Sequence, residues 1–194
     1  MKRAIRRTFA LLLLALPTYA VASLTRVPTI SEQLGQGATV IEADITKLEN
    51  STVTLDGEVI PVRLMSLENV DSGSGATEPD SRLLLPGGTL GDYDLDMEDV
   101  PELAVGEHVV LVVVAADATS PHGTLRLSSF GNGVFHREAD ARYGDTVTER
   151  TGRQLVDFGC TYAPTVFRAD DGDTPVPWSV FLTAIRTCTS TGNK

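Results

Sequence analysis

The chain has 194 residues, of which 42% are hydrophobic and 22% are charged, and its formal net charge at pH 7 is −10. This acidic excess argues against nucleic acids and anionic membranes as partners, because both carry the same sign of charge. The length suits one domain with a substantial core, and we find no long linker that would divide it.

The first 22 residues have the pattern of a secretory signal peptide. Basic residues lead, an apolar stretch follows at Phe9–Leu16, and Ala20-Val21-Ala22 forms a small-x-small cleavage site. The apolar stretch is too short for a membrane span, which needs about 20 residues. We therefore expect an exported chain, 23–194, in the periplasm or the extracellular space, without an integral membrane segment. That chain would carry 12 Lys and Arg against 26 Asp and Glu, a net charge of −14.

Strand patterns begin soon after the expected cleavage site. Ser31 is placed to cap a short helical turn. Apolar and polar residues then alternate from Thr39 to Glu49, which indicates a half-buried strand. Asp56-Gly57 is typical of a two-residue hairpin turn, and it lies between strands predicted at Thr52–Leu55 and Glu58–Leu67.

The apolar run Val109–Ala116 is rich in β-branched residues and is short for a helix, so it predicts a strand buried on both faces. Each face then needs a cover from another part of the chain. Upstream, Asp92–Met97 alternates between carboxylates and apolar side chains, which is typical of a strand with one solvent-exposed face. Downstream, Gly131-Asn132-Gly133 predicts a hairpin between strands at Thr124–Phe130 and Val134–Arg137.

The C-terminal stretch has a helical pattern. Four apolar residues recur at i, i+3, i+4 and i+7 on one face: Trp178, Phe181, Leu182 and Ile185. Cys188 continues that face, and Cys160 is the only other cysteine, so in an exported chain the two most simply form a disulfide. We expect the disulfide to fix the helix to the β-structure, where it covers the second face of Val109–Ala116. The predicted fold class is all-β with a C-terminal helix, an antiparallel barrel or sandwich with the helix packed on one side.

The sequence contains no recognised catalytic motif. Its three histidines, His108, His122 and His136, do not form a His-Glu-x-x-His zinc motif. No Gly-x-Ser-x-Gly elbow and no phosphate-binding glycine loop is present either. We therefore assign no catalytic residue and no cofactor. A secreted hydrolase with a dispersed catalytic site stays open as an alternative, because catalytic triads converge from distant positions in the chain.

Two acidic stretches are candidate calcium sites, since calcium prefers carboxylate oxygens. Neither has the glycine and glutamate positions of the calcium-binding loop. The candidate ligands are Asp92, Asp94 and Asp96 in the first stretch and Asp170, Asp171 and Asp173 in the second. A calcium-stabilised structural domain is therefore a further alternative. The solvent-exposed face of a strand explains the carboxylates of the first stretch equally well.

Several turn and strand residues have the order and spacing of a known family. They are Gly87-Gly88, Met97, Val100-Pro101, Val105-Gly106-Glu107, Val109–Val113, Gly133 and Phe135. Over Thr39–Arg137 the chain resembles a little-characterised β domain of secreted bacterial proteins that is often found beside matrixin-like zinc metalloproteases. The resemblance implies a β fold and an exported bacterial setting, and it carries over no catalytic residue. This sequence departs from the family pattern in having no recognisable protease module and in its acidic run, 92–99.

These observations together favour a non-enzymatic exported domain that binds a protein or cell-surface partner. Its core is well specified by the strand patterns and the expected disulfide, whereas no catalytic motif is found. Fold alone does not fix function, so the site must decide between binding, hydrolysis and calcium-dependent stabilisation.

Overall fold

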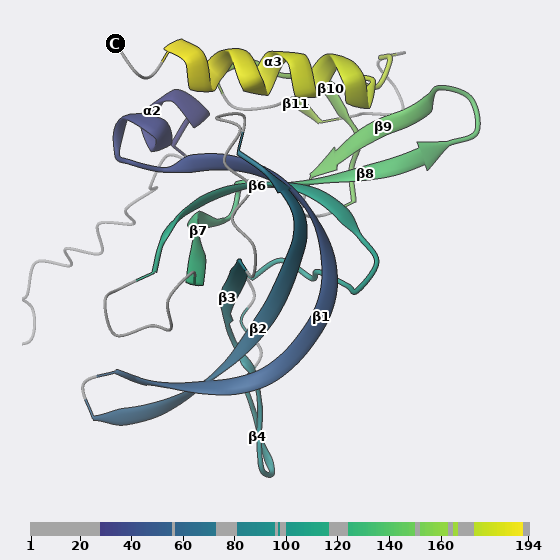
Figure 1. Cartoon of the computed structure of the whole chain (residues 1–194). Helices are drawn as coiled ribbons and strands as arrows, with labels where there is room; N and C mark the ends of the chain where they lie inside the picture. The colour runs from purple at the N-terminus through teal and green to yellow at the C-terminus, as the bar shows by residue number, and fades with distance from the viewer. Residues whose placement is uncertain are drawn as a thin grey trace, which may run out of the picture.

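A computed structural model of the chain describes residues 28–55, 57–72, 81–95, 97, 100–116, 124–149, 152–162, 165–166 and 173–191. The predicted signal peptide and His122 lie outside the described residues. Figure 1 shows the arrangement of the elements. In chain order they are α2 (Ile30–Gly35), β1 (Thr39–Leu55), β2 (Glu58–Asp71), β3 (Arg82–Pro86), β4 (Gly88–Leu90), β5 (Tyr93–Leu95), β6 (His108–Ala115), β7 (Thr124–Gly131), β8 (Val134–Asp140), β9 (Gly144–Glu149), β10 (Leu155–Asp157), β11 (Thr165–Val166) and α3 (Trp178–Thr191).

Seven strands form one mixed sheet in the order β1-β2-β3-β7-β6-β8-β9, and β1 also pairs with β6. The long strand β1 makes this second pairing by bending: Thr39–Asp44 pairs with β6, while Glu42–Leu55 pairs with β2. The pairings of β1, β2, β3, β7 and β6 thus follow one another around a curve, and β8 and β9 extend away from it (Figure 1). The predicted β fold with a C-terminal helix is confirmed. The strands form one large mixed sheet, because β3 and β7 pair in parallel, and this sheet is not a closed barrel.

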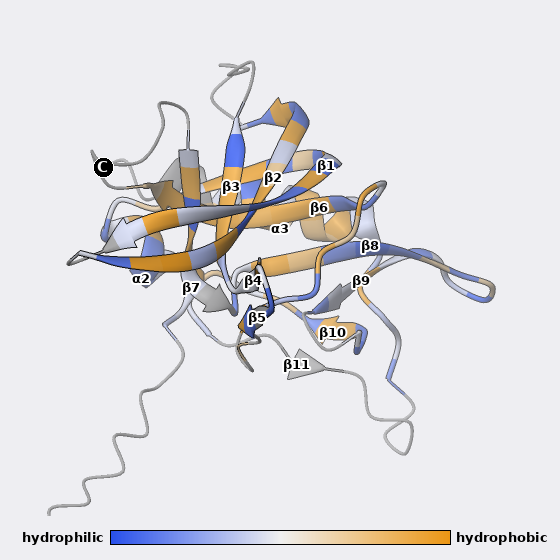
Figure 2. Ribbon diagram, turned by 90° about the horizontal axis from the view of Figure 1, so that it is seen from below, coloured by the Kyte–Doolittle hydropathy of each residue, from blue (hydrophilic) through white to orange (hydrophobic). Residues whose placement is uncertain are grey.

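The central strand β6 is buried on both faces, as its sequence predicts. Val109, Leu111 and Val113 belong to the core inside the curved sheet, together with Ile45, Met65, Leu67, Leu83 and Leu85. Val110 and Val112 belong to a second core on the outer face. Figure 2 shows β6 as a hydrophobic ribbon at the centre of the molecule. The strand β6 therefore contributes side chains to both cores, because its apolar run has no polar face.

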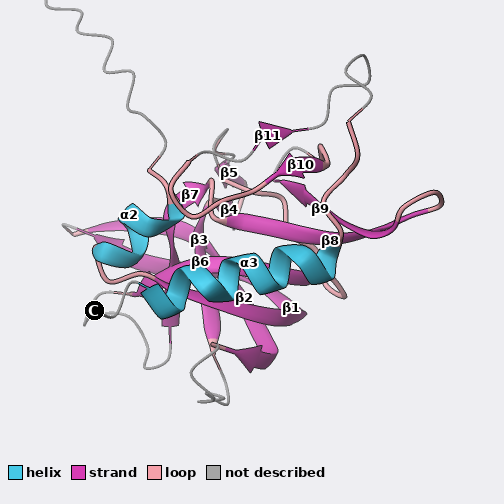
Figure 3. Ribbon diagram, turned by 90° about the horizontal axis from the view of Figure 1, so that it is seen from above, coloured by secondary structure: helices cyan, strands magenta, loops and turns pink. Residues whose placement is uncertain are grey.

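The helix α3 covers the second face of the sheet (Figure 3). Its residues Trp178, Phe181 and Ile185 are at most 6% exposed, and they pack on the second core with Phe135 from β8. The predicted helix and its buried face are confirmed. A helix with one apolar stripe is the expected cover for an apolar strand face, because it buries the stripe while its polar side stays in water.

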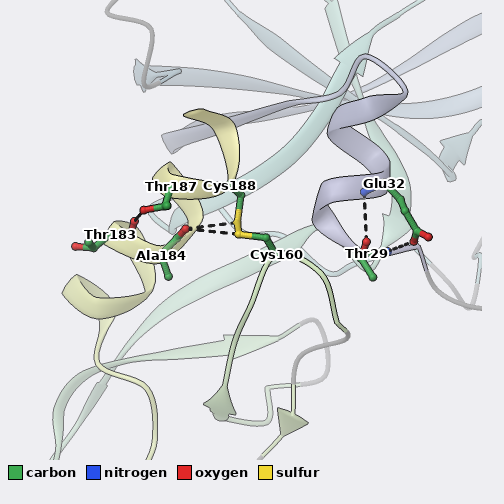
Figure 4. The surroundings of a disulfide bond; sticks show 7 residues. All are labelled: Thr29, Glu32, Cys160, Thr183, Ala184, Thr187 and Cys188. Atoms are coloured by element: carbon green, nitrogen blue, oxygen red, sulfur yellow. Dashed lines mark hydrogen bonds between the residues drawn. A yellow bond between two sulfur atoms is a disulfide. The ribbon is translucent and has the colours of Figure 1, made fainter. Parts of the chain in front are cut away.

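The disulfide between Cys160 and Cys188 is present, with the two Cα atoms 5.5 Å apart. Figure 4 shows the loop that carries Cys160 reaching the last turns of α3. The carbonyl oxygen of Cys160 also accepts a hydrogen bond of 2.9 Å from the backbone N–H of Ser31 in α2. One loop therefore ties both helices to the same side of the sheet.

Two local predictions are wrong. Ser31 does not cap α2; the cap is Thr29, whose hydroxyl accepts from the N–H of Glu32 while the Glu32 carboxylate accepts from the N–H of Thr29. This reciprocal capping box satisfies two helix-end donors at once. In addition, β7 and β8 do not pair as a hairpin, because each pairs with a different part of β6. Gly133 allows this, since a Cβ there would lie 2.9 Å from Cβ of Val112 on β6.

Candidate functional site

A polar cleft of about 730 Å³ lies between the segment before β6, the strands β8 and β9, and one side chain from β2. The bent strand β1 holds the segment before β6 in place through two backbone hydrogen bonds. The N–H of Gly106 donates to the carbonyl of Ile45 at 2.8 Å, and the N–H of Ile45 donates to the carbonyl of Glu107 at 3.0 Å. The lining residues are Arg63, Glu102, Leu103, Ala104, Glu107, His108, His136, Arg137, Glu138, Thr148, Glu149 and Gly152.

Arg63 reaches the cleft from the inner face of β2. It lies two residues before Met65 and pairs with Leu85, so by the alternation of the strand it shares the face of these core residues. Its Nε is buried and has no hydrogen-bond partner. Gly88 makes room for it, because a Cβ at Gly88 would lie 3.1 Å from Cγ of Arg63. The fold thus holds a cationic side chain in a polar cleft with an unused donor.

His136 and Glu107 form a pair across the cleft, with Nδ1 of His136 3.4 Å from Oε2 of Glu107. The same carboxylate oxygen accepts a hydrogen bond of 3.1 Å from the N–H of Ala104. Burial lowers the pKa of His136 below its ordinary value, and this effect outweighs the opposing influence of the Glu107 carboxylate. His136 is therefore neutral at pH 7 and offers both a donor and an acceptor nitrogen.

The remaining charges of the cleft divide into satisfied and unsatisfied groups. Arg137 donates from Nε to Asp145 at 3.1 Å, and Arg153 donates to Glu149 at 2.9 Å. The side-chain carboxylates of Glu102 and Glu138, in contrast, form no hydrogen bond or ion pair with any described residue. The cleft therefore presents an unpaired cationic donor and two unpaired carboxylates, a mixed pattern that a single small ion does not match.

His108 lies at the rim of the cleft between two carboxylates of β1. Its Nδ1 is 2.6 Å from Oδ1 of Asp44 and its Nε2 is 2.8 Å from Oε1 of Glu42. Partial burial lowers the pKa of His108, but the hydrogen bonds to Asp44 and Glu42 outweigh it and raise the pKa above its ordinary value. The pKa of Asp44 is lowered by hydrogen bonds from Asn69 and from His108. The structure thus favours a charged His108.

The six calcium candidates do not come together in the described part of the chain. Asp92 and Asp94 are exposed on the β4–β5 hairpin, and Asp94 accepts a hydrogen bond of 3.3 Å from the hydroxyl of Thr89. Asp173 precedes α3, far along the sequence. Asp96, Asp170 and Asp171 lie outside the described residues. Within the described ranges, no group of three or more His, Cys, Asp and Glu residues is placed to hold a metal ion. Calcium binding stays a prediction.

The sequence alone does not bring the residues of this cleft together, although it contains partial signals for some of them. Glu107 and His108 are neighbours in the sequence, and His136 lies in the predicted strand Val134–Arg137. Arg63 breaks an apolar alternation that continues at Met65 and Leu67, and an arginine on the inner face of a strand indicates a functional position. The pairing of β6 with β8, which brings His136 opposite Val109, has no such signal in the sequence.

Comparisons of the chain with protein-family models, with curated proteins and with solved structures found no match. The resemblance to the β domain of secreted bacterial proteins therefore stays a prediction. Among the described residues no helix has the length and apolar character that a membrane crossing needs.

Proposed function

We propose that this protein is an exported, non-enzymatic domain that binds a protein or cell-surface partner through the polar cleft. The observation that carries the proposal is the buried, unpartnered Nε of Arg63 in the cleft. A buried donor without a partner costs stability, so Arg63 is kept at an energetic cost, and this supports a binding role for the cationic side chain that it places in the lining of the cleft.

The other unpaired groups indicate the chemistry of the partner. The Arg63 guanidinium lines the cleft as a cation that suits an anionic group, while Glu102 and Glu138 supply carboxylates that suit cationic or N–H groups. A polypeptide surface carries all of these groups side by side, and the cleft has the open, polar character of a non-obligate interface. A partner protein segment of mixed charge therefore fits the cleft best.

A hydrolase is the second candidate, because His136 and Glu107 form a pair that is suited to general base chemistry. Among the described residues, the lining of the cleft includes no serine or cysteine, and its one hydroxyl belongs to Thr148, which is only 3% exposed. Binding therefore explains the cleft better than covalent catalysis does. A hydrolase acting through an activated water would show turnover of ester or peptide probes that His136→Gln abolishes, and we expect no turnover from either protein.

The proposal is tested by photo-cross-linking in the exported fraction of the source cell. A photoreactive phenylalanine analogue replaces Glu138 in the cleft or, as the matched control, the exposed Glu58 on β2 near its hairpin turn. We expect a discrete adduct from position 138 that is absent from position 58. No adduct from position 138, or the same adduct from both positions, would overturn the proposal.

Arg63→Met separates binding from stability in the same experiment. Methionine keeps much of the side-chain volume and removes the unpaired donor, so the free energy of unfolding should stay unchanged or rise by up to about 1 kcal/mol. The adduct from position 138 should nevertheless be lost. Chemical denaturation gives the first quantity and the cross-linking yield the second. A stable variant with an undiminished adduct would show that Arg63 has no part in binding.

A further inference from the structure

The charged contacts around His108 connect four elements of the fold: β1, β2, β6 and α3. On β1, Glu42 and Asp44 hold the two ring nitrogens of His108. On α3, Arg186 donates to Glu42 at 2.9 Å and to Asp71, the last residue of β2, at 3.0 Å. The helix is therefore linked to the start of β6 through a shared carboxylate.

The indole of Trp178 adds a direct contact between α3 and His108. The two rings meet edge to face with their centroids 5.7 Å apart, and Trp178 is 6% exposed. Trp178 also packs beside Phe181, the centre of the helix's buried face. The first turn of α3 thus rests on the His108 ring at one end of the second core.

The geometry of these contacts requires a proton on His108. A neutral imidazole has one N–H and one bare nitrogen, and only the imidazolium donates from both. Because carboxylates accept at both ring nitrogens, loss of the proton leaves one bare nitrogen facing a carboxylate oxygen at 2.6 or 2.8 Å. One attractive contact then becomes repulsive.

We propose that these contacts stabilise the packing of α3 on the sheet in a pH-dependent way. The packing is stabilised while His108 is protonated and weakened when His108 loses its proton. The proposal does not depend on the function of the cleft. The groups that face the network from the packed elements are Glu42 and Asp44 on β1, Asn69 and Asp71 on β2, and Arg186 and Trp178 on α3. On β8, which pairs with β6, His136 lies opposite Val109 and is paired with Glu107.

The direction of the effect follows from linkage. The folded state holds the His108 proton more tightly than the unfolded chain does, because the pKa is raised in the fold. The stabilisation is therefore fully present below the unfolded value, about 6.5, and is lost as the pH rises through the folded pKa. His136 acts in the opposite direction: its pKa is lowered in the fold, so its stabilisation is lost as the pH falls below about 6.5.

Trp178 is the only tryptophan in the sequence, so its fluorescence reports directly on this contact. In the mature protein, titrated from pH 5 to 9, we expect a transition in Trp178 emission with a midpoint above 6.5, because an adjacent imidazolium quenches an indole. Tm should fall by about 2–4 °C across the same transition, the shift that the loss of one charge-assisted hydrogen bond produces in a domain of this size.

Three variants decide the outcome. His108→Gln should abolish the fluorescence transition and flatten Tm over that range, and the conservative Glu42→Gln should move the midpoint to lower pH. His136→Gln is the matched control and should leave the midpoint unchanged, since His136 is paired with Glu107. A wild-type protein without a transition above pH 6.5, or a transition that persists in His108→Gln, would overturn the proposal.

Discussion

Phe181→Ala is expected to lower the free energy of unfolding by about 3–5 kcal/mol, because it removes a fully buried aromatic side chain and leaves a cavity. Phe181 is 0% exposed and lies at the centre of the second core. Its ring centroid is 4.9 Å from that of Phe135, 4.7 Å from that of Phe158 and 5.7 Å from that of Trp178. Such aromatic contacts stabilise the fold beyond the burial of apolar surface, so we expect a loss in the upper half of this range.

Val180→Ala is the matched control for Phe181→Ala, because Val180 is the preceding residue of the same helix and is 56% exposed. It should change the free energy of unfolding by less than about 0.5 kcal/mol, as is usual for exposed positions. Urea denaturation followed by circular dichroism measures both variants. Equal small effects would show that α3 does not cover the second face of β6, and the account of the two cores would then fail.

Loss of the Cys160–Cys188 disulfide should lower the free energy of unfolding by about 3–4 kcal/mol. The bond joins residues 28 apart in sequence, and in the chain-entropy model a loop of this size restricts the unfolded chain by that amount. The native contacts of the α3 face remain, since Trp178, Phe181 and Ile185 pack independently of the sulfur atoms. We therefore expect a folded but weakened protein.

The Cys160→Ala/Cys188→Ala double variant and the wild type, each measured with and without a thiol reductant, test this expectation. The reductant should shift the denaturation midpoint of the wild type towards that of the double variant and should not affect the double variant itself. A wild-type midpoint that is the same in both buffers would contradict a stabilising disulfide. An unfolded double variant would mean that the second core cannot form without the bond.

The sequence predicted those parts of the fold that local patterns encode. The apolar run of β6 has no polar face, so its burial on both sides followed directly, and the i, i+3, i+4, i+7 pattern from Trp178 identified its cover. The disulfide followed from the chain having only two cysteines. Each of these features depends on residues that are neighbours in the chain or on a count.

The strand pairings that build the cleft were not predictable in the same way. The parallel pairing of β3 with β7 joins Arg82 to Thr124, and no local pattern encodes a contact over that distance. A glycine-rich turn between β7 and β8 predicted a hairpin, but β6 supplies the pairing edge for both strands. His136 therefore came to lie near Glu107 by way of tertiary pairing, which single-sequence patterns do not report.

Hydrogen–deuterium exchange of the protein, with and without the partner captured by cross-linking, tests the central claim most directly. The claim is that the cleft between Glu102–Glu107, β8 and β9 is the binding site. We predict slower exchange on binding in the backbone amides of Glu102–Glu107 and β8, with no change in the β4–β5 hairpin. Slower exchange confined to other parts of the chain, with the amides of Glu102–Glu107 unaffected, would contradict the claim.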